Sequence, residues 1–395
     1  MQETGTQEPG TGRKFVLACT RCDCRLEPAP VFRCPDCDGA LEPRYRLDRF
    51  ERREHTAPEQ VYFDLLPLSS PDFLDNGITI RTPCRRATGL GAAIGLSDLW
   101  IKDESQQPTG TTKDRLAGTV LAVYRQFGIK EFVASSTGNS STALARAVLR
   151  DPGTRAHFFC GDRFFPNHDV PDDERTTLTT VEGSYVQASA RAREFAEDER
   201  LHLDPGFFNW ARREGLKLAY LEAVDQMGRT PDVIVQAVSS GMGILAAHKG
   251  LREYQQLGLV DRMPAFLMVQ ERSCAPSANG WREGRTELGP ADRIEQPEGL
   301  ATAILLGDGA PYYPYLHDIA TTTGGSIVDV PSSSLVEARR LLLDLEGLDV
   351  CHAAAATIAA LRDQVAAGLL RGDETVLVNL TGRSRVPAAQ DGASR

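Results

Sequence analysis

A single lysine stands at the start of an apolar-patterned run, directly behind a turn of small and hydroxyl residues. This residue, Lys113, lies within DESQQPTGTTKDRLAG, residues 103–118. A cation in the first turn of a helix gains nothing from the helix dipole, which favours anions at that end. Helix stability therefore does not explain its position. An isolated lysine is commonly a solvated charge, but a lysine amine enclosed in a pocket can bond covalently to a carbonyl compound.

Three other turns carry small and hydroxyl residues, namely SSTGNSS (135–141), SSGMG (239–243) and NLTGRS (379–384). In open α/β sheets, ligands bind at the carboxyl ends of strands, where such turns converge. A Ser/Gly loop that enters a helix offers backbone N–H groups and a positive dipole end, which suits a phosphate. Such loops are also ordinary tight turns. Only the combination of one lysine, one phosphate loop and several hydroxyls predicts a lysine-bound pyridoxal 5'-phosphate.

Five of the nine cysteines lie close together near the N-terminus, in CTRCDCRLEPAPVFRCPDC. Two Cys-x-x-Cys pairs within this stretch are typical of two knuckles that share one tetrahedral zinc ion. The predicted ligands are Cys19, Cys22, Cys34 and Cys37, with Cys24 left over. Four thiolates leave no open coordination position, so the zinc would be structural. The alternative is a set of reduced thiols on a knuckle that has lost its metal.

Composition and charge exclude several classes of function. The net charge of −10 and the isoelectric point near 5.3 argue against nucleic acid or an anionic membrane as the partner. No apolar run approaches the length that spans a bilayer. The first fourteen residues lack the basic and apolar regions of a signal peptide, which predicts a cytoplasmic protein. We expect a small amino-acid substrate as partner, and a homodimer as the assembly.

Strand and helix patterns alternate from residue 130 onward, which is typical of an α/β protein with parallel sheets. Strands are expected at 131–135, 155–160, 185–189, 265–270, 326–330 and 375–382, and helices at 139–150, 190–200, 214–228, 332–347 and 351–368. The stretch 231–250 is expected to run from strand through a glycine loop into a helix. This order predicts two doubly wound, open parallel-sheet domains that follow a small Cys-rich knuckle.

The predicted organisation has five parts. They are a disordered leader (1–14), the zinc knuckle (15–45), a large cofactor-binding α/β domain (46–120 and 214–385), a small α/β domain (121–213) and a disordered tail (386–395).

The order and the amino-acid sequences of these motifs resemble those of the threonine synthase branch of the fold-type II (tryptophan synthase β-like) pyridoxal-phosphate enzymes. DESQQPTGTTKDR resembles the cofactor-lysine motif E-x-x-x-P-T-G-S-F-K-D-R, and SSTGNSS resembles S-S-T-G-N-T. VSSGMG resembles the phosphate loop, VNLTG the closing strand, and FNWARREGLK (208–217) the pattern N-P-Y-R-x-E-G-x-K. The knuckle also resembles the start of many threonine synthases. The resemblance therefore covers about residues 17–385.

The resemblance implies a role for each matching residue. Lys113 is expected to bind the cofactor aldehyde and later to move protons, while Asn139 donates a hydrogen bond to the phenolic oxygen and Thr381 faces the pyridine nitrogen. The residues expected to hold the cofactor phosphate are Ser239, Ser240, Gly241, Met242 and Gly243. Those expected to hold the substrate's carboxylate or distal phosphate are Ser136, Thr137, Ser140, Asn209 and Arg212. The alternative for Arg212 is a surface arginine at a helix start.

The sequence departs from the branch's pattern at four places. Thr111-Thr112 replaces Ser-Phe, SSGMG replaces G-N-x-G-N, CHAAA (351–355) replaces E-P-A-S-A, and GRSRVP (382–387) replaces G-x-G-L-K-D. His352 is either a proton carrier or a capping or solvated histidine, and Cys351 is equally well a small packing residue. These changes surround the substrate more than the cofactor. The cofactor is therefore better determined than the exact reaction.

The resemblance implies a lyase that acts on a phosphorylated amino acid, in amino-acid biosynthesis. In a threonine synthase, phosphate is eliminated from O-phosphohomoserine and water is added at the β-carbon. The alternative within the fold is β-replacement on O-phosphoserine, as in cysteate synthase-like relatives, in a specialised pathway. A hydroxyamino-acid dehydratase is disfavoured because Arg212 suits a distal anion. A catalytically silent zinc-bearing paralogue is the alternative from another class, and the intact Lys113 argues against it.

Overall fold

The computed structural model describes residues 14–75 and 77–384, which form one antiparallel sheet and two mainly parallel sheets. Apart from Lys14, the expected leader and tail lie outside the described residues. The largest sheet has the order β12-β11-β10-β13-β5-β4, and β4 alone in it runs antiparallel to its neighbour. Its strands are β4 (Cys84–Arg86), β5 (Asp98–Asp103), β10 (Val233–Ala237), β11 (Ala265–Glu271), β12 (Ser326–Val330) and β13 (Thr375–Leu380). The predicted α/β class with parallel sheets is confirmed.

The smaller parallel sheet has the order β8-β7-β6-β9. Its strands are β6 (Glu131–Ser135), β7 (Arg155–Gly161), β8 (Thr176–Val181) and β9 (His202–Leu203), with helices α4 (Asn139–Arg150) and α5 (Tyr185–Asp198). The strand expected at 185–189 is wrong, because these residues form the first turn of α5. Ser184 and Gln187 close a capping box there, and this local hydrogen bonding favours a helix start. The β-branched run TTLTTV supplies the edge strand instead.

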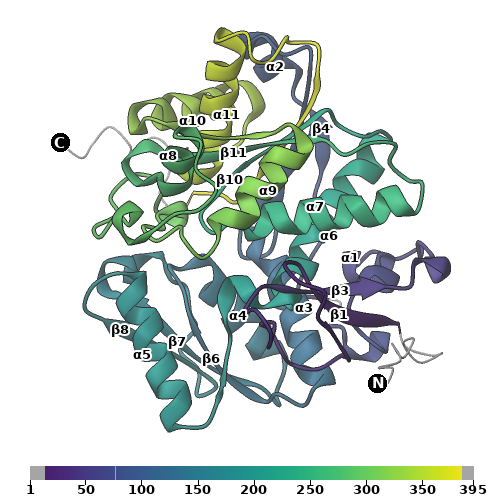
Figure 1. Cartoon of the computed structure of the whole chain (residues 1–395), viewed down its shortest axis with the longest axis vertical. Coiled ribbons are helices and arrows are strands. Elements are labelled where there is room, and N and C mark those ends of the chain that lie inside the picture. The colour runs from purple at the N-terminus through teal and green to yellow at the C-terminus, as the bar shows by residue number, and fades with distance from the viewer. Residues whose placement is uncertain (1–13, 76, 385–395) are drawn as a thin grey trace, which may run out of the picture.

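Helices cover both faces of the large sheet (Figure 1). An apolar cluster buries one face beneath α2 (Thr88–Ile94), α10 (Ser332–Glu346) and α11 (His352–Ala366). The other face lies against α6 (Trp210–Met227), α7 (Met242–Gln256) and α9 (Tyr313–Thr323). Two short helices complete this part of the fold: α1 (Pro58–Val61) contacts α6, and α8 (Pro276–Arg282) contacts β11 and β12. The carboxyl ends of β10 and β13 consequently point into the space between the two parallel sheets.

Helix α6 is the central helix of the molecule and is almost entirely buried. All of its residues except Asp225 and Gln226 are buried. It packs against α3 (Lys113–Gln126) at Gly215, where an added Cβ would lie 2.2 Å from the Arg115 carbonyl oxygen. A side chain at this position would push the two helices apart. The close packing fixes the start of α3, where Lys113 lies.

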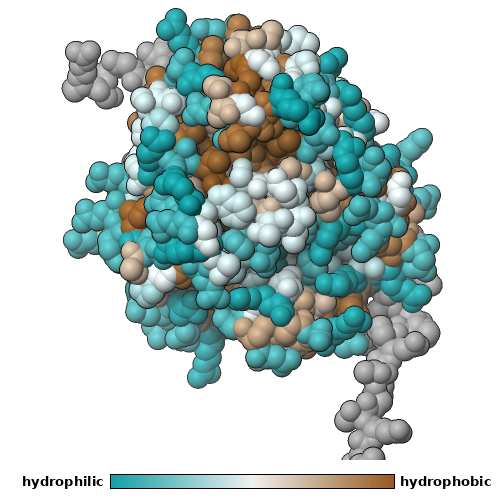
Figure 2. Space-filling view, turned by 45° about the horizontal axis from the view of Figure 1, so that its top comes forward, coloured by the Kyte–Doolittle hydropathy of each residue, from teal (hydrophilic) through white to brown (hydrophobic). Residues whose placement is uncertain are grey.

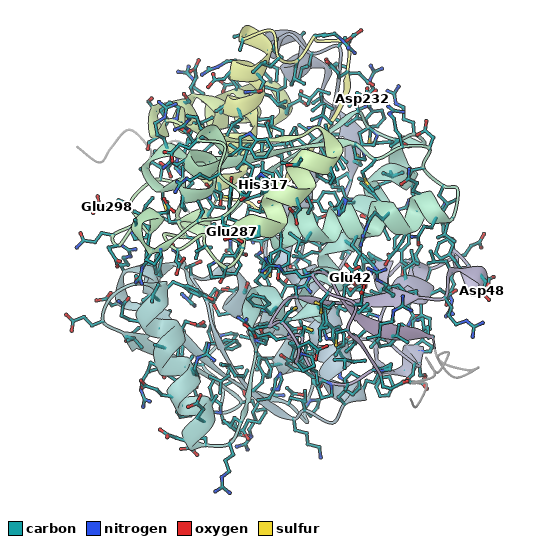
Figure 3. All side chains as sticks on the ribbon, in the orientation of Figure 1. Glu42, Asp48, Asp232, Glu287, Glu298 and His317 are labelled. Atoms are coloured by element: carbon teal, nitrogen blue, oxygen red, sulfur yellow. The ribbon has the colours of Figure 1, made fainter. Side chains whose placement is uncertain are left out.

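The N-terminal knuckle is a three-stranded antiparallel sheet of β1 (Phe15–Cys19), β2 (Arg25–Leu26) and β3 (Leu41–Tyr45). In Figures 1 and 3 it lies beside α6 and α7, and Glu42 of β3 forms an ion pair with Arg252 of α7 at 2.9 Å. Phe32 of the knuckle stacks near Trp210 of α6, with ring centroids 5.5 Å apart. The knuckle is therefore packed onto the start of α6.

The face in Figure 2 is mostly hydrophilic at its edges, with apolar side chains gathered near its top. Among residues 14–75 and 77–384, no helix combines the length and the apolar character needed to cross a membrane.

Candidate active site

Lys113 lies on the wall of a hollow of about 670 Å³ between the two parallel sheets. The same hollow is lined by Asn139, by Thr381 and by every residue of the loop 239–243. No hydrogen bond or ion pair involves the Lys113 amine in the described part of the chain. Burial, and secondarily the positive charge of Arg212, lower the pKa of Lys113 to about 8. A substantial fraction of this amine is therefore neutral, and hence nucleophilic, at slightly alkaline pH.

The two residues after Lys113 hold the turn that presents it. Asp114 accepts a hydrogen bond from the Thr109 backbone N–H at 2.7 Å, which closes the Pro-Thr-Gly turn. Arg115 is fully buried and donates to Glu104 through Nε and Nη2 at 2.7 and 2.8 Å. It also donates to Glu222 of α6 at 3.0 Å. In the Lys-Asp-Arg motif, Lys113 thus supplies the reactive amine, while Asp114 and Arg115 hold the surrounding backbone in place.

The loop between β10 and α7 forms a cradle at a helix N-terminus. In the described part of the chain, no backbone N–H from Ser239 to Gly243 donates a hydrogen bond. Gly241 has φ = 81°, and an added Cβ there would lie 2.2 Å from Leu316. Only glycine fits such a position without strain. Free N–H groups at a helix N-terminus are well suited to a phosphate.

The floor of the same hollow carries two buried polar side chains. The Tyr220 hydroxyl interacts with Asn379, and Asn379 Nδ2 donates to Gln236 at 3.4 Å. The floor of the hollow is therefore polar. The residues present fit pyridoxal phosphate: the loop 239–243 would hold the phosphate and Lys113 would bind the aldehyde, with Asn379 and Tyr220 in the wall of the same hollow. Neither Tyr220 nor Asn379 was predicted from the sequence, because no local motif marks them.

A second hollow, of about 710 Å³, adjoins the first and shares Lys113 and Asn139 with it. Ser136, Thr137, Ser140 and Arg212 all line this second hollow, as the predicted substrate site requires. Its remaining walls include the rings of Tyr185, Phe207 and Tyr312, which sequence reasoning missed. These aromatic side chains come from three separate segments and carry no pattern that would have identified them.

Arg212 is buried and paired rather than free. Its Nε lies 2.9 Å from an Asp204 carboxylate oxygen, and both side chains are almost completely buried. Since this contact uses the Nε edge, the remaining guanidinium donors are left for the hollow. The alternative of a surface arginine is therefore wrong.

Asn209 does not line either hollow. Its side chain accepts from the Ala211 N–H at 3.0 Å as the helix cap of α6, and donates to Asp204 at 3.1 Å. These contacts hold Asp204 and the start of α6 in place. Because Asp204 pairs with Arg212, Asn209 affects the site only indirectly, through the position of Arg212.

The predicted zinc ligands lie together. The sulfur atoms of Cys19, Cys22, Cys34 and Cys37 all lie within 4.8 Å of one another, with the Cys19–Cys37 and Cys22–Cys34 pairs at 3.5 Å. Zinc bound by four sulfurs at about 2.3 Å separates them by roughly 3.8 Å, so the cluster fits such an ion. Cys24 lies nearby, next to Cys34 and Asp36. The cluster could hold a metal ion.

The fold and the site together define a class of enzyme. Residues 77–382 match the family described as pyridoxal-phosphate dependent enzyme, and the chain belongs to this family. Within the family it falls in the threonine synthase-like branch. Threonine synthase from Methanosarcina acetivorans is 29% identical over 385 residues, covering 93% of this chain and 91% of that protein. Cysteate synthase from Methanospirillum hungatei is 27% identical over 395 residues, covering 93% of this chain and 89% of that protein.

Solved structures show the same fold at lower identity. L-serine ammonia-lyase from Rhizomucor miehei superimposes with a TM-score of 0.65 at 18% identity, covering 79% of this chain and 96% of that one. Threonine deaminase isoform 2 from Solanum lycopersicum gives 0.63 at 15% identity, covering 78% and 85%. At these identities the likeness concerns the fold alone.

Proposed function

We propose that the protein catalyses a phosphate-releasing elimination or replacement on a phosphorylated amino acid. The leading form is threonine synthase-like, converting O-phosphohomoserine to threonine and phosphate. The observation that carries the proposal is Arg212, a buried arginine whose free donors face a hydroxyl-lined hollow next to Lys113. A guanidinium fork in such a place suits a substrate phosphate or carboxylate. The similarity to threonine synthases and cysteate synthases over nearly the whole chain supports the same class of reaction.

The residues would divide the chemistry between two adjoining hollows. Bound pyridoxal phosphate supplies an electron-withdrawing ring that stabilises negative charge at a substrate's α-carbon. Lys113 lines both hollows, so its amine can take the α-proton from the substrate and return it. Ser136, Thr137 and Ser140 offer hydroxyls to the substrate's anionic groups, together with Arg212. The rings of Phe207 and Tyr312 exclude water from the reacting carbon atoms.

The alternative is β-replacement on O-phosphoserine, as in a cysteate synthase-like enzyme. Cys351 takes the place of a glutamate of the resembled pattern and removes a carboxylate from the site. Without this negative charge, the wall of the site repels an anionic incoming group less than a wall with a glutamate would. A catalytically silent paralogue is less consistent with two features of the described residues. The amine of Lys113 forms no ion pair, and the backbone N–H groups of the loop 239–243 donate no hydrogen bond.

We expect the purified holoenzyme to release inorganic phosphate from O-phosphohomoserine or O-phosphoserine. Serine, threonine and homoserine are the matched substrates without phosphate, and none of them should turn over at a comparable kcat/KM. The assay measures phosphate colorimetrically and amino-acid products by mass spectrometry. Production of ammonia and a keto acid from serine or threonine, with no phosphate release from either ester, would show a dehydratase instead.

We further propose that the metal of the knuckle is zinc, held by Cys19, Cys22, Cys34 and Cys37. The knuckle contacts α6 and the turn before it, and residues of that turn line the substrate hollow. Ala40 donates its N–H to the Tyr315 hydroxyl at 3.0 Å, and Trp210 Nε1 donates to the Val31 carbonyl at 2.8 Å. Ala40, Phe207 and Tyr315 belong to one apolar cluster, and Phe207 is a wall of the hollow.

Chelation is expected to release about one zinc ion per chain and to loosen residues 15–45, because structural zinc contributes directly to local folding. Since the knuckle braces the segment 206–213, the KM for the phosphorylated substrate should rise, while kcat and cofactor retention should change less. Metal analysis and hydrogen exchange of the 31–41 and 206–213 peptides measure both effects. Protein prepared without chelators that contains no zinc would contradict the four-thiolate site.

A homodimeric assembly and a cytoplasmic location complete the proposal, and sedimentation of the holoenzyme tests the first of these.

A further inference from the structure

The knuckle carries one cysteine more than a tetrahedral metal site needs. Cys24 lies outside the set of four predicted ligands. Its sulfur, the Cys34 sulfur and an Asp36 carboxylate oxygen nevertheless all lie within 4.8 Å of one another. The Cys24 thiol also interacts with the side chains of both of these neighbours. The fifth thiol is therefore a direct neighbour of one predicted ligand.

That ligand, Cys34, belongs to the segment that docks the knuckle onto α6. Two residues before it, the ring of Phe32 lies 5.5 Å from the ring of Trp210, measured between centroids. Trp210 also donates to the backbone carbonyl of Val31 at 2.8 Å. Trp210 is the first residue of α6 and stands two residues before Arg212. The position of this knuckle segment is therefore linked to the start of α6, which carries the arginine of the substrate hollow.

The spare thiol differs from the four ligands in its availability. The thiolate is the form of cysteine that binds a metal, and it is also the form that attacks an oxidant. Cys34 is buried, but Cys37 beside it is exposed and Cys24 is partly exposed, so a small oxidant can approach from solvent. Cys22 lies 3.5 Å from Cys34, yet as a ligand its sulfur is occupied by the metal. Cys24 can react with an oxidised Cys34 while the other three ligands are still in place.

We propose that Cys24 and Cys34 form a reversible switch that responds to hydroperoxides, with Cys24 as the thiol that resolves oxidised Cys34. The Cys34 thiolate attacks one oxygen of hydrogen peroxide and becomes a sulfenic acid, while the O–O bond breaks and the other oxygen takes up a proton and leaves as water. The Cys24 sulfur then attacks the Cys34 sulfur and a disulfide forms. The hydroxyl group leaves with the Cys24 proton as a second water. The peroxide gains the two electrons that the two thiols lose.

The switch acts on the active site through the metal. Oxidation removes one of the four ligands, so the ion is released. Because a structural metal contributes directly to local folding, its loss loosens the knuckle and its contact with α6. The KM for the phosphorylated amino acid then rises. This effect on the KM rests on the proposed function, whereas the disulfide rests on the geometry of the knuckle alone.

Peptide mapping of the holoenzyme after treatment with hydrogen peroxide tests the pairing. The remaining thiols are alkylated, and the protein is digested with trypsin without reduction. The peptides 22–25 and 34–44 should be joined, and fragmentation of the joined pair should place the bond between Cys24 and Cys34. About one metal ion per chain should pass to a chromogenic chelator, and dithiothreitol with zinc should restore it. Disulfides between other knuckle cysteines, with none between these two, would overturn the proposal.

The variant Cys24→Ser supplies a second readout, since it retains all four ligands and should bind metal as the wild type does. Without a resolving thiol, Cys34 should proceed to the sulfinic acid, which dithiothreitol does not reduce. Most of the metal binding should then be lost after peroxide and dithiothreitol, whereas the wild type recovers it. Cys84→Ser changes a partly exposed cysteine of β4, outside the knuckle, and is the matched control. Equal recovery in wild type and Cys24→Ser would refute the switch.

The KM for the phosphorylated amino acid separates this inference from the proposed function. In the oxidised wild type it should rise to the value of the chelated enzyme and return after dithiothreitol and zinc. In oxidised Cys24→Ser it should rise in the same way but fail to return. An unchanged KM in fully oxidised wild type would overturn the link from the switch to the substrate hollow. If the disulfide forms but the untreated enzyme releases phosphate from neither ester, only the proposed reaction is refuted.

Discussion

Replacing Lys113 by alanine is expected to lower kcat for phosphate release by at least about 10²- to 10⁴-fold, the usual contribution of a positioned general base. The loss should be larger than for any other single substitution, because the same amine is proposed to bond to the cofactor. Borohydride reduction of the wild-type holoenzyme should fix the cofactor on the peptide that contains Lys113. The variant should show no such adduct.

Other buried lysines provide the control for this experiment. Lys102 pairs with Glu222, Lys217 with Glu253 at 2.8 Å, and Lys249 with Glu214 at 2.9 Å. Burial lowers the pKa of Lys102 and Lys217 as well, but each of the three amines is held by a carboxylate, whereas, among the described residues, the Lys113 amine is not. Reduction of the cofactor onto one of these three lysines would contradict the assignment of Lys113.

The pH dependence of cofactor capture tests the environment of Lys113. Only the neutral amine reacts, so the rate of capture by the apoprotein should rise with pH and reach a plateau above about 8, following the lowered pKa of Lys113. The charge of Arg212 contributes to this lowering, because a neighbouring cation disfavours the protonated amine. Arg212→Gln combined with Asp204→Asn, which leaves no buried carboxylate unpaired, should therefore shift the plateau to higher pH. A plateau only near pH 10 in the wild type would show a solvated lysine.

Local motifs identified residues that line one hollow, the proposed cofactor site, but few of the residues that surround it. The lysine turn and the loop 239–243 could be recognised because each packs its chemistry into a few consecutive residues. Asp204 could not, since it stands eight residues before Arg212 in a segment without periodicity, and only the fold brings the two together. Tyr220 and Asn379 lie on a helix and a strand whose patterns indicate burial but not the direction of a polar atom.

The secondary-structure prediction failed where two signals competed. YVQAS has strand-like composition, yet the Ser184 cap converts it into the first turn of α5. The extended run TTLTTV was overlooked because it is only partly buried at the sheet edge. Strands β6 and β12, which are bounded as expected, lie where apolar runs meet clear turn signals.

Removing the charge of Arg212 is expected to raise the KM for the phosphorylated amino acid about 10- to 150-fold while the cofactor stays bound. The simple variant Arg212→Ala would also leave Asp204 buried without its cation, at a cost of about 3–5 kcal/mol to stability. Its effects on substrate binding and on folding would then be mixed. The pair Arg212→Gln with Asp204→Asn avoids this, because an amide pair keeps a hydrogen bond without charge.

Asp204→Asn alone is the matched control. It keeps the Arg212 guanidinium beside the hollow, so its KM should remain closer to the wild-type value than that of the double variant. Arg212→Lys should recover only part of the affinity, since an ammonium group cannot form the two-pronged contact. The cofactor should stay bound in all of these variants, because Arg212 lines the second hollow and not the first, which contains Lys113, Thr381 and the whole loop 239–243. If the double variant instead loses the cofactor, or keeps the wild-type KM for every phosphorylated amino acid, no substrate phosphate lies at Arg212. A dehydratase acting on an unphosphorylated amino acid would then explain the site better.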